Sequence, residues 1–271
     1  MQKGGGNISV HTRLIIGLIM LLTGGPGYSL FAQNTSNQVW YTYNQQAILS
    51  SHWGYLFDIN HRTSSFKTNQ SVLSAARLGL TYLTDRNHRI TAGYAWFGSH
   101  FKDSEKNLLT ENRLWQQYQV FKKAGKTNYF HRFREEQRWR ELMPQNGSKK
   151  GHVAFSFRTR YMYQHQGPIW PVTEKNKFGV WWQGATEIML HAGEGINKHY
   201  FDQLRLIGGI TLLPTRQINL AILYQYINQY RPSTQQDYNI HSIRLTLLHQ
   251  LDFSKKQKQQ NVAPVRVGEK N

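Results

Sequence analysis

The stretch Val153–Tyr163, VAFSFRTRYMY, decides the fold class. Its odd positions carry Val, Phe, Phe, Thr, Tyr and Tyr, whereas its even positions carry Ala, Ser, Arg, Arg and Met. Successive side chains of a β-strand point to opposite faces, so this alternation predicts a strand with one apolar, aromatic face and one small or cationic face. A helical period is sustained nowhere in the sequence. We therefore predict an all-β protein.

The same alternation recurs along most of the chain, in about eleven segments whose spacing is that of hairpins. A tilted strand of roughly ten residues is long enough to cross a hydrocarbon layer, whereas strands of soluble sheets average about five or six residues. The segments are therefore of membrane length. They lie near 38–47, 52–62, 71–83, 88–98, 111–122, 127–140, 152–164, 177–190, 200–213, 217–229 and 240–253.

The connections between these segments alternate in length. Short ones near 84–87, 124–126 and 214–217 alternate with longer polar ones near 99–110, 141–151, 191–199 and 230–239. Short turns at one end and long loops at the other are typical of outer-membrane barrels. Aromatic residues near the segment ends, such as Trp96 and Trp139, fit the interfacial girdles of such barrels.

The main alternative is a soluble β-sandwich or lipocalin-like barrel, whose strands also alternate. Here, however, the polar face carries several arginines per strand, as at Arg132, Arg134, Arg138 and Arg140, which is too dense for an ordinary solvent-facing surface. We therefore predict an antiparallel, up-and-down transmembrane β-barrel. Bacterial single-chain barrels have an even strand count, so we expect ten to twelve strands, with twelve preferred. Twelve strands would require a further pass within 164–176, whereas ten would mean that 38–47 is not a barrel strand.

The first 32 residues read as a secretory signal, in which Lys3 and Arg13 flank the short apolar run Leu14–Leu22. We expect the barrel to occupy 33–253 and a basic, disordered tail to occupy 254–271. The chain has no cysteine, which excludes disulfides, thiolate metal sites and a lipoprotein anchor. These features predict a protein of the Gram-negative outer membrane that contacts outer-membrane lipids and lipopolysaccharide, and the barrel-assembly machinery during biogenesis.

The formal net charge of +18 would ordinarily suggest a polyanionic partner. Export argues against nucleic acid, and we expect none. Arginines inside a barrel, together with lysines in loops and in the tail, account for the surplus. The sequence leaves the oligomeric state open.

A resemblance to a known family rests on arginines and glutamates that are spaced over several strands, with glycines and aromatic residues among them. They are Arg77, Gly79, Leu80, Tyr82, Gly93, Tyr94, Glu111, Arg113, Trp115, Gln116, His131, Arg132, Arg134, Glu136, Arg138, Arg158, Arg160, Tyr161, Glu187 and Arg205. Over roughly Trp40–Phe253 the chain resembles the exported barrel family catalogued as domain of unknown function 2490, common in Bacteroidetes-type bacteria. The resemblance implies location and architecture, but no catalytic residue. The closing aromatic would be Phe253, although eighteen residues follow it.

One face of each predicted strand must point into the barrel, and the polar face collects charged residues there. Small barrels fill their interior with side chains, and bidentate pairs of arginine and carboxylate satisfy such a polar interior. We therefore predict a charge lattice that plugs the lumen or leaves a narrow, closed channel. Its members are Arg77, Arg89, Glu111, Arg113, Arg132, Arg134, Glu136, Arg138, Arg158, Arg160, Glu187, Arg205 and Arg244.

Two other functions stay open. The predicted arginines outnumber the glutamates, which would favour anions in a narrow pore, although Asp58 and Asp252 could pair with some of them. An outer-membrane lipid hydrolase would need a serine beside a histidine. His152 and Ser156 share a face but lie about 13 Å apart along the strand, and the adjacent His241 and Ser242 point to opposite faces. We expect no enzyme.

Metal and cofactor motifs are also weak. His191, Glu194 and His199 fall in one predicted loop, but their spacing fits no metal site that we can name. The sequence has no Walker-type or other Gly-rich phosphate loop, and Gly208 and Gly209 lie in the middle of a predicted strand. We expect neither a metal nor a cofactor.

Overall fold

The computed structural model describes residues 35–66, 71–100, 108–142, 152–173, 177–194, 196, 199–231 and 236–254. The predicted signal segment 1–32 lies outside them, as does the predicted tail apart from Ser254. Within the described ranges, no helix has the length and apolar character needed to cross a membrane.

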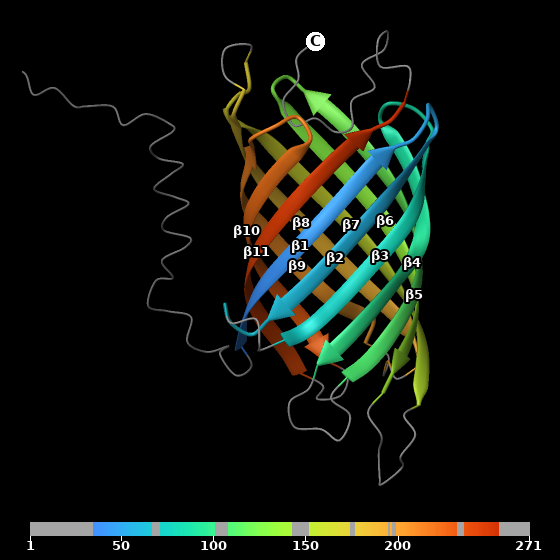
Figure 1. The fold of residues 1–271 in the computed structure, drawn as a ribbon. Coiled ribbons are helices and arrows are strands. Elements are labelled where there is room, and N and C mark those ends of the chain that lie inside the picture. Colours follow the sequence, from blue (N-terminus) through green and yellow to red (C-terminus); the bar gives the residue numbers. More distant parts are fainter. Residues whose placement is uncertain are drawn as a thin grey trace, which may run out of the picture. The chain divides into compact units, whose positions relative to one another are not determined.

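The described residues form eleven strands that close into one β-barrel. The predicted all-β barrel is therefore confirmed, with a strand count inside the expected range of ten to twelve. Figure 1 shows the strands tilted around the barrel wall. In chain order they are β1 (Thr35–Ile48), β2 (Trp53–Thr63), β3 (Ser71–Leu83), β4 (His88–His100), β5 (Leu108–Ala124), β6 (Thr127–Glu141), β7 (Val153–Trp170), β8 (Gly179–Gly193), β9 (Phe201–Leu213), β10 (Ile218–Arg231) and β11 (Gln236–Asp252).

The preferred count of twelve is not reached, for a reason visible in β7. This strand continues through Gly167 and Pro168 to Trp170, with an irregular register between Pro168 and Trp170. Of the stretch 164–176 that we considered for a further pass, the residues up to Trp170 therefore prolong β7. The first segment is a true barrel strand, because β1 pairs with β2 from Val39 to Ile48.

An odd strand number determines how the barrel closes. Each strand from β1 to β11 is antiparallel to the next in sequence, so β1 and β11, which are neighbours at the closure, run in the same direction. The Phe253 amide donates a hydrogen bond to the Ile48 carbonyl at 2.8 Å, and the Tyr43 hydroxyl lies 3.0 Å from His249 Nδ1. We call this parallel contact the seam.

The two ends of the barrel differ in their connections. At the end where β1 and β11 finish, the connections are 49–52, 84–87, 125–126, 171–178 and 214–217; we call it the turn end. At the other end, the loop end, they are 64–70, 101–107, 142–152, 194–200 and 232–235. Gly125, in the tightest turn, has φ +58°, a left-handed conformation that glycine adopts without strain.

The two faces of the wall have opposite polarity. Large apolar side chains such as Leu78 (59% exposed) and Phe133 (51%) point outward, whereas neighbours such as Arg134 (4%) and Glu136 (2%) are buried inside. The interior also holds apolar groups, most prominently Trp115.

Two glycines make room for Trp115. A Cβ added at Gly79 would come within 2.6 Å of the Trp115 ring, and one at Gly93 within 2.8 Å. Gly79 faces Gly93 in the β3–β4 register, and Gly93 faces Trp115 in the β4–β5 register. A bulky inward side chain at either glycine would therefore displace the indole.

Candidate functional site

All thirteen predicted lattice residues lie on the inward side of their strands. Alternation brings them there, because on each strand they share parity with buried residues such as Ser156 on β7 and Met189 on β8. The contacts among them are organised around carboxylates, each of which meets one or more guanidinium groups.

Glu136 of β6 is the most connected carboxylate. Arg160 Nη1 donates a hydrogen bond to its Oε1 at 2.7 Å, and Arg113 Nη1 donates to its Oε2 at 3.0 Å. The Nη1 atoms of Arg134 and Arg158 lie 3.7 and 3.8 Å from its two oxygens. One buried negative charge thus faces four positive charges from β5, β6 and β7.

Glu187 of β8 forms the second centre. Its Oε1 accepts hydrogen bonds from Arg132 Nη2 at 2.6 Å and from Arg160 Nη2 at 2.8 Å, and Arg205 Nη1 lies 3.6 Å from its Oε2. Arg160 therefore binds Glu136 and Glu187 at once. This double contact links the two centres into one network across β5 to β9.

Two further carboxylates extend the charged interior. Glu111 accepts hydrogen bonds from Arg113 Nε at 2.8 Å and from both Nε and Nη2 of Arg138, the latter at 3.1 Å. Asp58 of β2 receives Nε and Nη2 of Arg77 at 2.8 and 2.6 Å, the bidentate geometry typical of strong arginine–carboxylate pairs.

A fifth carboxylate, Asp202, was missed by sequence reasoning. Simple alternation would place it on the outer face beside Leu204, but the β8–β9 register is irregular here, pairing Met189 with Gln203 and Leu190 with Phe201. The extra residue turns inward and is 2% exposed. Its Oδ2 lies 2.6 Å from Arg158 Nε and its Oδ1 3.7 Å from His191 Nδ1. A β-bulge has no reliable sequence signal at this position.

Arginines outnumber these carboxylates inside the barrel. Twelve described arginines face inward, and eight of them lie within 4.0 Å of one of the five carboxylates. In the described part of the chain, Arg62, Arg89, Arg140 and Arg244 have no such partner. The predicted lattice left out Arg62 and also Arg140, although the sequence places Arg140 on the polar face of its strand. For Arg62, the available signal was the parity that it shares with Asp58 and Asn60.

The charges are concentrated in one half of the lumen. On β5, Glu111 and Arg113 lie nearer the loop end than Gln117 and Gln119 do, and on β7 Arg158 precedes Gln164 and Gln166. We call the lattice region the loop half. In the remaining turn half, neutral pairs dominate: Thr81 and Thr91 are hydrogen-bonded at 3.0 Å, and Thr211 donates to Gln183 at 3.1 Å.

Arg89 is the predicted lattice member that the fold does not bring to the others. It lies on β4 at the turn end, where its guanidinium stands 4.8 Å from the centre of the Phe121 ring. Phe253, the predicted closing aromatic, is 59% exposed just after β11.

The histidines considered for catalysis or metal binding contact other groups than the partners considered for them, apart from His191, whose Nε2 lies 3.1 Å from the His199 carbonyl oxygen. His152 at the loop end is hydrogen-bonded to Glu194. This bond lowers the pKa of the Glu194 carboxyl below its usual range, and a weaker hydrogen bond from the Phe155 amide acts in the same direction. Ser156 is buried inside the barrel.

The second pair is divided in the same way. His241 Nδ1 contacts the Tyr224 hydroxyl at 2.6 Å on the outer face, while Ser242 lies inside next to Gln225. His199 stacks on Tyr230. Among the described residues, no three His, Asp or Glu side chains are grouped as a metal site.

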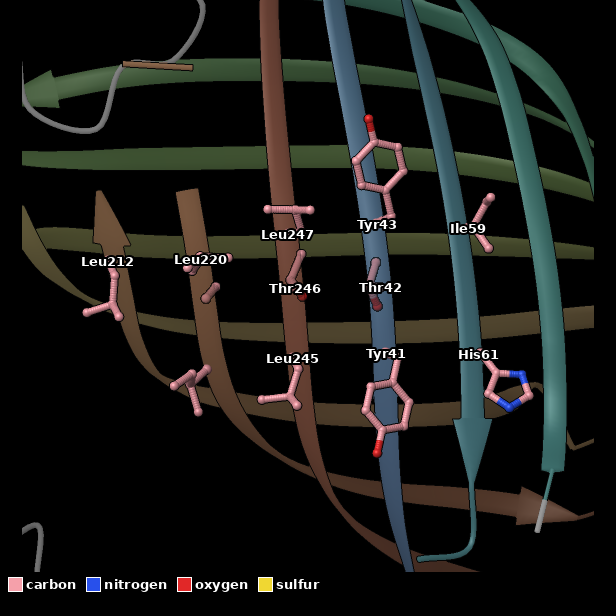
Figure 2. A pocket seen from close by; sticks show the side chains of 12 residues that line it. Tyr41, Thr42, Tyr43, Ile59, His61, Leu212, Leu220, Leu245, Thr246 and Leu247 are labelled. Atoms are coloured by element: carbon pink, nitrogen blue, oxygen red, sulfur yellow. The ribbon is translucent and has the colours of Figure 1, made fainter. Parts of the chain in front are cut away.

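The outer wall has a hollow of about 550 Å³ centred on the seam (Figure 2). Its lining comes from β9, β10, β11, β1 and β2 and includes Tyr41 and Tyr43 on one side of the seam and Leu245 and Leu247 on the other. No Asp, Glu, Lys or Arg contributes to it. Most of its lining is apolar, and His61 is its one ionisable side chain besides the two tyrosines.

The family model described as "Protein of unknown function (DUF2490)" matches residues 37–239. This range includes strands β2 to β10 in full, most of β1 and the start of β11. No curated protein matches the chain.

Proposed function

The chain belongs to the DUF2490 family of proteins of unknown function, and we propose that it is an outer-membrane barrel whose charge lattice keeps the lumen closed. One observation carries the proposal: the wall is apolar outside and charged inside. A soluble barrel has the reverse polarity, because water surrounds it and its core must be dry.

The outer face supports a membrane setting. Its strands are 11 to 18 residues long, enough to cross a hydrocarbon layer when tilted. Their outward rows carry residues such as Leu80, Ile90, Leu114 and Ile222, all largely exposed in the isolated chain. Glu135 interrupts its row on β6 and accepts a hydrogen bond from Thr159 at 3.0 Å. In this proposal, lipids and lipopolysaccharide cover the outer face, and the assembly machinery receives the chain during insertion.

The lattice supports closure. Side chains from neighbouring strands are tied by buried ion pairs, and Arg205 of β9 extends far enough for its guanidinium to lie 5.5 Å from the centre of the Trp40 ring on β1. Side chains just fill a barrel of about eight strands, and a barrel of eleven strands is wider, so in this proposal the long arginine side chains that reach across the lumen close it. The interior is therefore filled by a network whose members cannot move independently.

A second candidate, a narrow anion-favouring pore, has one observation in its favour: twelve inward arginines meet five paired carboxylates. Fixed positive charge along a water-filled path favours anions. The two candidates differ in whether a continuous water path exists.

The experiment for the first proposal is fractionation of the full chain expressed in a Gram-negative host. We expect recovery with outer membranes and faster migration of the unheated protein on a denaturing gel than of the heated protein. Recovery from the soluble periplasm with identical migration before and after heating would contradict the membrane barrel.

A further inference from the structure

Three arginines converge beside the seam in the loop half of the lumen. Arg62 lies on β2 and Arg244 on β11, so they flank β1 from its two sides, and Arg205 reaches the same place from β9. The Arg62 guanidinium carbon lies 3.7 Å and that of Arg205 5.5 Å from the centre of the buried Trp40 ring. These two carbons are therefore no more than about 9 Å apart.

Positive charges outnumber negative ones around this point, because Glu187, which lies 3.6 Å from Arg205 Nη1, is shared with Arg132 and Arg160. The charged groups that act most strongly on Arg62 through space are Arg205, Arg113, Arg244 and Arg77, with no carboxylate among them. On Arg205 the strongest charge is that of the shared Glu187, and Arg160 and Arg244 act against it. Asp58, the acid on the same strand as Arg62, is already bound in bidentate fashion by Arg77. Arginine keeps its proton at physiological pH, so the repulsion cannot be relieved by deprotonation.

Several donors of these three groups are unused within the described residues. Arg62 spends its Nε on Asn60 at 2.9 Å, which leaves both Nη atoms. Arg244 makes no hydrogen bond, and its Nε is buried. Arg205 directs Nε and Nη2 to Gln203, leaving Nη1 at 3.6 Å from Glu187, too far for a good hydrogen bond.

Buried like charges with unused N–H groups need an anion to balance them. We propose that Arg62, Arg205 and Arg244 hold a small oxyanion of the phosphate or sulfate type in the loop half of the lumen. Guanidinium groups bind such tetrahedral oxyanions through paired N–H donors, which chloride cannot use equally well. The inference rests on the proposed closed barrel, since a water-filled lumen would screen the three charges.

The test uses the full mature barrel refolded in a non-ionic detergent without lipid, with inorganic phosphate, sulfate or chloride at matched ionic strength. We expect phosphate and sulfate to raise the melting temperature relative to chloride, since a ligand that binds only the folded state stabilises it. Equilibrium dialysis with radiolabelled phosphate should find about one ion per chain.

The paired substitution Arg62→Gln and Arg244→Gln should weaken phosphate binding at least tenfold and remove the difference between phosphate and chloride. Arg89→Gln, which removes an unpaired arginine at the other end of the lumen, is the matched control and should bind phosphate as the unaltered protein does. Because the paired variant also removes like-charge repulsion, it should unfold at a higher temperature in chloride than the unaltered protein.

Equal melting temperatures of the unaltered protein in phosphate, sulfate and chloride would overturn the site, as would full phosphate binding by the paired variant. Neither outcome bears on whether the barrel is closed. That question is decided separately by the conductance of the unaltered protein.

Discussion

The two halves of the lumen satisfy their buried polar groups in different ways. In the loop half, five carboxylates are shared among eight arginines, and a single side chain such as Arg160 contacts two of them. In the turn half, neutral partners such as Thr81 and Thr91 bond in separate pairs. The comparison teaches that the same wall can support a connected network or isolated contacts. Damage should spread in the first and stay local in the second.

The largest effect is expected from Glu136→Gln in the loop half. The change keeps the shape of the side chain but leaves four arginines facing a neutral group. Removing one partner of a buried ion pair typically lowers the free energy of unfolding by about 3–5 kcal/mol. Chemical unfolding in lipid vesicles measures the loss. The matched control is Glu135→Gln, the same change one residue away on the outer face, which should cost nothing measurable. Equal effects of the two variants would contradict the network.

On the outer wall the two halves should behave alike, because hydrocarbon contacts both. An arginine in place of Ile188, beside the loop half, or of Leu80, beside the turn half, should destabilise the barrel in bilayers by up to about 2–4 kcal/mol. Vesicle unfolding again provides the measurement, with Ile188→Leu and Leu80→Ile as controls. A neutral outcome at both positions would mean that this wall does not face lipid.

In the turn half, Thr91→Val should cost only about 1–2 kcal/mol, since it breaks one neutral hydrogen bond and leaves the buried Thr81 hydroxyl unpaired. Combining it with Glu136→Gln should give an additive loss, because the two sites share no partner. A strong departure from additivity in a double-mutant cycle would show that the halves are one network.

The smallest effect concerns pH at the two ends. The His152 hydrogen bond lowers the pKa of Glu194 at the loop end, and a hydrogen bond with His88 lowers that of Asp85 at the turn end. A carboxyl whose folded pKa is depressed stabilises the fold above its ordinary pKa and loses that contribution as pH falls through the lower, folded value. Below about pH 4, the Phe155 amide, which donates to Glu194, should therefore exchange faster relative to its intrinsic rate. Glu194→Gln should remove this pH dependence. If the Phe155 amide of the unaltered protein stays equally protected from exchange as the pH falls, the prediction is contradicted.

Much of the wall could be predicted from sequence because alternation is a local property. The rows of Val153–Tyr163 identify which side chains share a face, and the same parity places Arg134 with Glu136. Register is not local, so the sequence could not say that Arg160 meets both Glu136 and Glu187. The glycines at 79 and 93 were visible as family residues, but their role in admitting Trp115 required the cross-strand pairing.

The misses have equally specific causes. Asp202 enters the lumen through a bulge that breaks the parity on which the prediction relied. The preference for twelve strands came from the even-number rule, which assumes that the first and last strands are antiparallel; here β1 and β11 meet in parallel.

The closed lumen is tested most directly by the conductance of the purified barrel in planar bilayers. The account predicts weak or absent steady current from the unaltered protein, and measurable current once Arg134→Ala and Arg158→Ala loosen the contacts of Glu136. Because two positive charges have been removed, this current should be less selective for anions than a current through a lumen with all its arginines would be. Large, steady conductance from the unaltered protein would contradict the closed lattice.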